Sequence, residues 1–134
     1  MIGILIVTHK ELAEALMGTY DLILGSREGI WAVSLDPTAP PEVSRDQIQR
    51  ALAQANNGTG VIILTDMLGG TPSNLTLPFL KDGKVEVITG VNLPMLMKLA
   101  QIREKTDLRE AALALKQSGQ KGITVASEVL RKKK

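Results

Sequence analysis

The sequence predicts an α/β domain with a three-layer, doubly wound and mainly parallel sheet. Short aliphatic runs alternate along the chain with longer amphipathic segments, which is the pattern of βαβ units. Glycine and proline residues separate most of these segments. The chain has 134 residues, no cysteine and very few aromatic residues, so we expect one aliphatic core that forms without disulfides.

The first part of the chain contains two predicted strands and a helix between them. Residues 2–7 are almost entirely aliphatic and form the first predicted strand. Apolar residues then recur at helical spacing over residues 11–24 and stop at Gly25, which predicts a helix that ends at a glycine. Residues 30–35, IWAVSL, form the second predicted strand.

The middle of the chain begins with the proline-rich loop DPTAPPEVS. Ser44 with Gln47 predicts a capping box at the start of a helix that ends near NNG. The third and fourth predicted strands follow at residues 60–65, GVIILT, and 84–89, KVEVIT.

The last part of the chain predicts two helices and a short strand. One helix is expected over residues 94–103. Asp107 with Glu110 predicts a capping box for a second helix, which ends near Ser118. GITVAS, residues 122–127, is the candidate for a fifth, antiparallel edge strand.

Right-handed crossovers would place helices on both faces of the sheet, and the expected strand order is 2-1-3-4. Ligands of such sheets bind at the carboxyl ends of the strands, at the point where the strand order reverses. That point lies between the first and third strands. His9, the only histidine in the chain, follows the first strand, and Asp66 follows the third. We therefore expect these two side chains to meet.

Two glycine-containing loops follow the third and fourth strands. In TDMLGGTPSN, residues 65–74, Gly69 and Gly70 allow a tight turn and a close approach of the backbone to a ligand. Thr71 is predicted to be the N-cap of a helix with a proline in its first turn, which leaves free amides for an anion. TGVNLPM repeats this design, with Asn92 as the expected cap.

His9 and Asp66 together suit nucleophilic catalysis. A neutral imidazole keeps a lone pair on one ring nitrogen, and a carboxylate on the other fixes the tautomer and stabilises the charge that develops during attack. The hydroxyls of Thr8, Thr71 and Ser73 and the loop amides favour an anionic electrophile, so phosphoryl transfer is the expected chemistry. One histidine and one aspartate are too few for a zinc site, and no cofactor is expected. The residues leave open which ring nitrogen reacts.

Composition limits the other functions. No apolar run approaches the roughly 18 residues of a membrane span, and the opening segment is too short for a signal peptide, so we expect a soluble, cytoplasmic protein. The formal net charge of +2 comes largely from the last four residues, RKKK, and no aromatic residues interleave with them, which disfavours nucleic-acid binding. We place the domain at residues 1–128 and a basic tail at 129–134.

The segments IVTHKELAEAL, TDMLGGTPSN and GVNLPML occur in this order in the chain. Together they resemble the IIA domain of the mannose-type (mannose/fructose/sorbose) sugar phosphotransferase system, and the resemblance covers nearly the whole chain. It implies a phosphocarrier in which His9 accepts a phosphoryl group from phospho-HPr and Asp66 supports it. The family commonly has aromatic residues at the positions of Leu68 and Ser73, so these departures concern the preference for partners.

The same resemblance implies partners. A IIB component, here expected on a separate chain, would receive the phosphoryl group for sugar uptake, and the membrane would be contacted only through a IIC/IID transporter. The family commonly forms homodimers in which the last strand is exchanged. By analogy, residues 123–127 would pair with the sheet of a partner, although the sequence does not distinguish exchange from local pairing.

Two other functions remain open at this point. The phosphoryl-donor subunit of dihydroxyacetone kinase has a related domain, although its corresponding loop lacks the GGTP pattern of residues 69–72. A regulatory module controlled by phosphorylation of His9 would use the same chemistry. A receiver domain is disfavoured because no acidic cluster follows the first strand, and a nucleotide-binding module because no GxGxxG motif follows it.

Overall fold

The computed structural model describes residues 1–104 and 107–132. The predicted α/β fold is confirmed, because four parallel strands form one sheet in the order β2-β1-β3-β4. The strands are β1 (Gly3–His9), β2 (Ile30–Leu35), β3 (Val61–Thr65) and β4 (Val85–Thr89).

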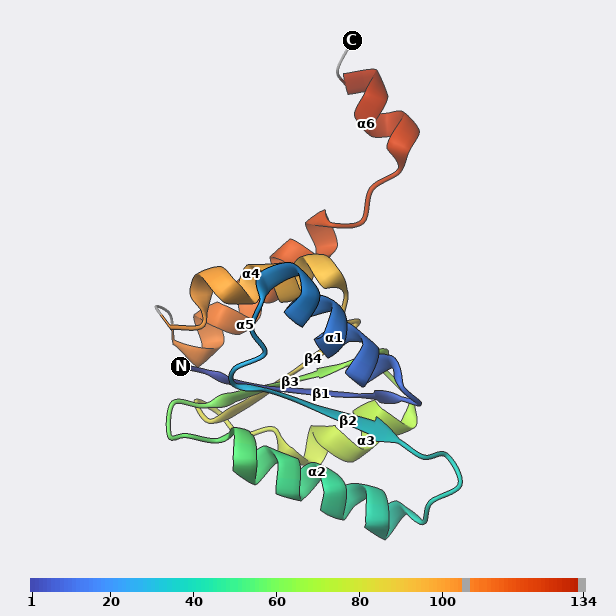
Figure 1. Cartoon of the computed structure of the whole chain (residues 1–134), viewed down its shortest axis with the longest axis vertical. Coiled ribbons are helices and arrows are strands. Elements are labelled where there is room, and N and C mark those ends of the chain that lie inside the picture. The colour runs from blue at the N-terminus through green and yellow to red at the C-terminus, as the bar shows by residue number, and fades with distance from the viewer. Residues whose placement is uncertain (105–106, 133–134) are drawn as a thin grey trace.

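Helices cover both faces of this sheet, as Figure 1 shows. One face carries α1 (Leu12–Leu24), α4 (Leu93–Ile102) and α5 (Leu108–Lys121). The other face carries α2 (Pro41–Ala55), α3 (Thr71–Thr76) and the short 3-10 helix η1 (Leu77–Phe79). The last helix, α6 (Ala126–Lys132), projects away from these layers (Figure 1).

The central strands are buried on both faces, which explains their continuous aliphatic sequences. In β1, Ile4 and Ile6 pack under α1, α4 and α5, while Leu5 and Val7 pack toward α2. All four side chains are fully buried. Such a strand has little freedom to slip, because a shift by one residue would exchange the two sets of side chains.

Two helix starts differ from the prediction. Helix α2 begins at Pro41, and Ser44 is a buried residue inside the helix instead of its cap. The fixed φ of proline suits the first turn, so the helix starts earlier than the capping box indicated. Helix α3 begins at Thr71 itself, with Gly70 in the N-cap position and no side-chain cap.

Two other predicted caps are confirmed. The side chain of Asn92 accepts a hydrogen bond from the main-chain N–H of Met95 at 3.0 Å. The side chain of Asp107 accepts one from the N–H of Glu110 at 2.8 Å. These bonds satisfy amide groups that have no partner within the helix.

The prediction of a fifth strand at residues 122–127 is wrong for the single chain. Residues 123–125 have no regular secondary structure, and Ala126 already begins α6. A strand needs a neighbour whose hydrogen-bonding groups it can pair with, and β-branched composition alone does not supply one. This segment leaves the body of the domain after α5 and reaches no strand among the described residues (Figure 1).

A buried arginine joins the amino ends of β1 and β2. The guanidinium group of Arg103 donates hydrogen bonds to the carbonyl oxygens of Ile2, Glu28 and Gly29, each with a contact of 2.8 Å. Arg103 is only 6% exposed. Arg103 therefore fixes the edge of the sheet that lies opposite the carboxyl ends of the strands.

Candidate active site

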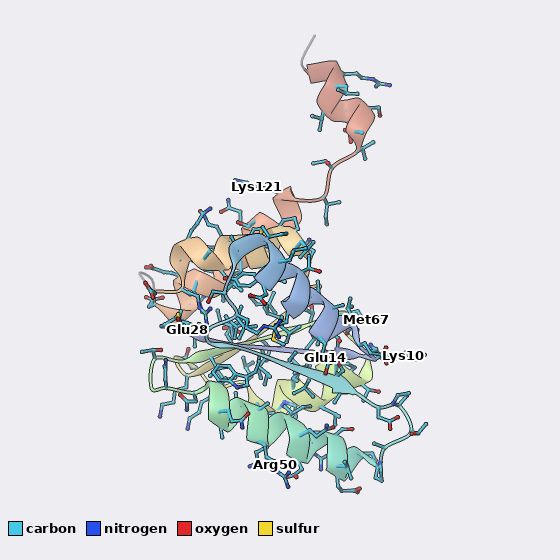
Figure 2. All side chains as sticks on the ribbon, viewed as in Figure 1. Lys10, Glu14, Glu28, Arg50, Met67 and Lys121 are labelled. Carbon is cyan, nitrogen blue, oxygen red and sulfur yellow. The ribbon has the colours of Figure 1, made fainter. Side chains whose placement is uncertain are left out.

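His9 and Asp66 lie together at the carboxyl edge of the sheet. The parallel register of β1 and β3 brings the residues that end these strands side by side. In Figure 2, Lys10 and Met67, which follow the two residues in sequence, lie at this edge, and Glu28 lies at the opposite one. The meeting of His9 and Asp66 expected from strand order is therefore confirmed.

The two residues share two hydrogen bonds to a single oxygen. The main-chain N–H of His9 donates to Oδ2 of Asp66 at 3.0 Å, and Nδ1 of the His9 ring lies 2.8 Å from the same oxygen. The second oxygen, Oδ1, accepts a hydrogen bond from the N–H of Met67 at 3.0 Å. The carboxylate is thus fixed by three contacts and orients the imidazole ring.

The environment keeps Asp66 charged. Burial alone would raise the pKa of its carboxyl group, but hydrogen bonds from the ring and the main chain of His9, with the attraction of the imidazole, outweigh it. The pKa of Asp66 is therefore held below its ordinary value of 3.8. A carboxylate accepts hydrogen bonds but cannot donate them, so Nδ1 of His9 carries the proton. The lone pair of the neutral ring is then on Nε2.

Nε2 of His9 lies beside a glycine. The side chain of His9 is 47% exposed and that of Asp66 is 14% exposed. A Cβ atom on Gly70 would lie 2.7 Å from Cε1 of the ring and 3.1 Å from Nε2. Only glycine therefore leaves room for the ring and for an atom that approaches Nε2. Gly69 precedes it with a φ of 90°, the left-handed conformation that the sharp turn requires.

The three hydroxyl residues predicted at the site differ in their exposure. Thr71 is exposed as the first residue of α3. Thr8 is fully buried, and its Oγ1 accepts a hydrogen bond from the N–H of Ala13 at 2.7 Å, at the start of α1. Ser73 is also fully buried, and its hydroxyl has no partner among the described residues. Thr71 is thus the one hydroxyl of the three that a surface ligand can reach in this conformation.

Several features of this site could not be read from the sequence. The main-chain N–H groups of His9 and Met67 hold Asp66, and such donors leave no trace in residue type. Lys10 has a φ of 45°. Leu12, Met67 and Leu68 are exposed apolar residues in the segments that flank the pair. We call these three side chains the apolar rim. In the sequence, only Leu68 had been singled out, as a departure from the family pattern.

Neither a cluster of metal-ligating side chains nor a membrane-spanning helix occurs among the described residues. Residues 1–104 and 107–132 contain no group of three or more histidine, cysteine, aspartate or glutamate side chains that could hold a metal ion. No helix in the same ranges is long and apolar enough to cross a membrane.

Comparison with known proteins decides the family. Residues 3–116 match the model of the EIIA-man family, described as the PTS system fructose IIA component. The chain belongs to this family. It is a IIA component of the mannose-type phosphotransferase system, and the resemblance noted in its three sequence motifs is confirmed.

Individual relatives agree with this assignment of the IIA domain. The PTS system fructose-specific EIIA component of Bacillus subtilis is 30% identical over 135 residues, covering 100% of this chain and 92% of that protein. The mannose-specific EIIAB component of Escherichia coli is 32% identical, but this chain spans only 38% of its length. A crystal structure of the phosphotransferase system component EIIA from Streptococcus agalactiae has a TM-score of 0.86 at 27% identity, covering 96% of this chain and 99% of that one.

Proposed function

We propose that the protein is a phosphocarrier that receives a phosphoryl group on Nε2 of His9. The observation that carries this proposal is the fixed orientation of the ring: Nδ1 contacts Oδ2 of Asp66 at 2.8 Å, while Nε2 lies beside Gly70 on a half-exposed side chain. The donor in this family is phospho-HPr and the acceptor is a IIB component, and we assign both partners to this protein.

The transfer step moves charge from one ring to another. The lone pair on Nε2 of His9 attacks the phosphorus atom, and the P–N bond to the donor histidine breaks. The electron pair of that bond returns to the donor ring, which leaves as a neutral imidazole. The His9 ring becomes positively charged and keeps its proton on Nδ1, where the Asp66 carboxylate stabilises it. Transfer to the acceptor is the same step in reverse.

The loop after β3 is the proposed cradle for the phosphoryl oxygens. Gly69 makes the turn, Gly70 brings the main chain close to Nε2, and the exposed residue Thr71 follows them. These groups are fixed before the reaction, so they need little reorganisation when charge develops on the oxygens. Thr8 and Ser73 are buried, and we assign them a structural role beneath the site, without direct contact to the phosphoryl group.

The rim around His9 fits a protein partner. Leu12, Met67 and Leu68 are 44%, 56% and 67% exposed. Apolar side chains around a reactive atom can exclude water when a partner docks, which strengthens the electrostatic interactions at the centre. We assign these three side chains to contact with both the donor and the acceptor.

The outer edge of β4 is the proposed site of a second copy of the chain. Among the described residues β4 pairs in a ladder only with β3, and a groove of about 440 Å³ lies between β4 and α5. The tail that follows α5 exposes Ile123, Val125, Val129 and Leu130. Exchange of these tails between two copies would cover both the groove and the apolar tail, which supports a homodimer.

The test of the phosphocarrier is direct. The protein is incubated with phosphoenolpyruvate, enzyme I and HPr, and its intact mass is measured at neutral to alkaline pH. One acid-labile phosphoryl group on the wild type, and none on His9→Gln, is the expected result. No gain in mass, with a donor that is active on another IIA protein, would contradict the proposal.

The dimer has a separate test. Sedimentation equilibrium is expected to give a dimer for the wild type and a monomer for Val125→Asp. Leu22→Asp, a change at an even more exposed apolar residue on α1, is the control and should remain dimeric. A wild type that is monomeric at high micromolar concentration would refute the exchange.

A further inference from the structure

Lys10 has an uncommon backbone conformation. Its φ of 45° is the only positive φ at a non-glycine residue within residues 1–104 and 107–132. In this left-handed region the Cβ atom of an L-residue crowds the following carbonyl oxygen, so glycine is strongly preferred. A lysine remains in this conformation only where the surrounding contacts impose it.

Those contacts lie on both sides of Lys10. Before it, His9 is fixed because its N–H and its ring both contact Oδ2 of Asp66, at 3.0 and 2.8 Å. After it, the N–H of Ala13 donates to Oγ1 of Thr8 at 2.7 Å. The chain must therefore turn from β1 into α1 within the short segment between these two anchors.

The side chain of Lys10 has no comparable set of contacts. Lys10 is exposed, and no ion pair or hydrogen bond of its ammonium group occurs within the part of the chain that the structure describes. In Figure 2 it lies at the carboxyl edge of the sheet with Met67. The constrained part of this residue is its main chain.

We propose that Lys10 is a positioning residue whose left-handed backbone, and not its ammonium group, places His9 on Asp66. The turn at residue 10 lets the main-chain N–H and the ring of His9 reach the same carboxylate oxygen while α1 still starts on Thr8. A β-branched side chain at this position, which resists a positive φ more strongly than lysine does, is expected to pull His9 away from Asp66. This inference deepens the proposed function, on which its transfer measurement rests.

The first test compares Lys10→Gly with Lys10→Ala. Both variants lack the ammonium group, but only glycine adopts a φ of 45° without crowding. The folding equilibrium constant, measured by urea unfolding, is expected to be about fivefold higher for Lys10→Gly than for Lys10→Ala. Phosphoryl transfer from HPr to Lys10→Gly is expected to match the wild type within about twofold, because the backbone and not the charge serves His9.

The second test follows the ring of His9. Because it is the only histidine in the chain, its ¹⁵N resonances are unambiguous. Wild type and Lys10→Gly are expected to show Nδ1 protonated in the neutral ring. Lys10→Val, whose β-branched side chain resists a positive φ, is expected to show a mixture of tautomers and transfer slower by about tenfold or more.

The outcomes separate this inference from the proposed function. Equal stability of the glycine and alanine variants would overturn it, and so would a tenfold loss of transfer in Lys10→Gly, which would assign the ammonium group to the site. If Lys10→Val does not fold, the comparison of Gly and Ala still decides. If the wild type accepts no phosphoryl group while the stability order and the ring signature hold, the proposed function fails and the positioning role stands.

Discussion

His9 donates to one oxygen of Asp66 from both its main chain and its ring. The other carboxylate oxygen accepts from the main chain of Met67, so the carboxylate cannot rotate without losing hydrogen bonds. The ring in turn cannot flip to present Nδ1 without giving up its contact with Asp66. This arrangement supports the proposal that Nε2 is the nucleophile, and it leads to the following expectations for substitutions at the site.

Asp66→Asn is expected to slow phosphoryl transfer while the fold is kept. The amide has no charge to stabilise the positively charged ring, and its NH₂ group favours the tautomer with the lone pair on Nδ1. The expected loss is on the order of 100-fold, measured as the single-turnover rate of transfer from phospho-HPr. Circular dichroism should match the wild type. An unchanged rate would remove Asp66 from the mechanism.

The pH dependence of stability should report the same carboxylate. The folded-state pKa of Asp66 lies below its ordinary value of 3.8, so its contribution is present above that value and is lost as the pH falls through the folded pKa. Urea unfolding of wild type and Asp66→Asn should differ by about 1–2 kcal/mol near neutral pH. This difference should shrink below about pH 4. A difference that grows with acidity would contradict the sign.

Gly70→Ala is expected to slow phosphoryl transfer more than it destabilises the fold. The new Cβ would lie 2.7 Å from Cε1 of His9, so the ring must move and Nε2 loses its open side. Transfer should fall by about 100-fold, in line with misplacement of a reacting group by an ångström. Gly18→Ala is the matched control, because its Cβ meets nothing within 4 Å in the middle of α1. Normal transfer by Gly70→Ala would show that the ring tolerates the added methyl group.

The apolar rim should affect docking and leave the chemistry unchanged. The double substitution Met67→Ala with Leu68→Ala removes two exposed side chains, and transfer from phospho-HPr should slow by about tenfold. Phosphorylation by phosphoramidate, a small donor that needs no docking surface, should proceed as in the wild type. Leu22→Ala, an exposed residue near the end of α1, is the control. Equal losses with both donors would place Met67 and Leu68 in the chemical step.

Arg103→Met should destabilise the protein without changing its chemistry. The substitution removes the donors that the carbonyl oxygens of Ile2, Glu28 and Gly29 share, at the edge of the sheet away from His9. The expected loss is about 3 kcal/mol in the free energy of unfolding, measured with urea. The transfer rate of the folded fraction should equal that of the wild type. A slower rate would indicate coupling between the two edges of the sheet.

The fold could be predicted to the extent that local patterns determine it. Residues 30–35 were predicted as a strand with the bounds observed for β2, and Asn92 and Asp107 cap their helices as expected, because a cap is a contact between neighbours in sequence. The prediction that Ser44 caps its helix is wrong, because the helix already starts at Pro41. The prediction of a strand at residues 122–127 is wrong for the single chain, because strand pairing depends on a partner that is distant in sequence and that the sequence does not reveal.

The site could be predicted in its position but not in its detail. The strand order placed His9 beside Asp66, since parallel strands end at one edge. The proposal of Nε2 uses a main-chain N–H, the conformation of Lys10 and the missing Cβ of Gly70, none of which a residue pattern specifies. The burial of Thr8 and Ser73 could not be predicted either, because a hydroxyl next to a site can face either inward or outward.

Nε2, the ring nitrogen of His9 that does not contact Asp66, also determines the order in which partners can bind the proposed carrier. With Nδ1 on Asp66 and Nε2 as the only reactive atom, donor and acceptor must occupy the same space in turn, so no complex of all three proteins can transfer the group. The two half-reactions then follow ping-pong kinetics. In the proposed carrier, unphosphorylated HPr would therefore compete with IIB for the same position beside His9.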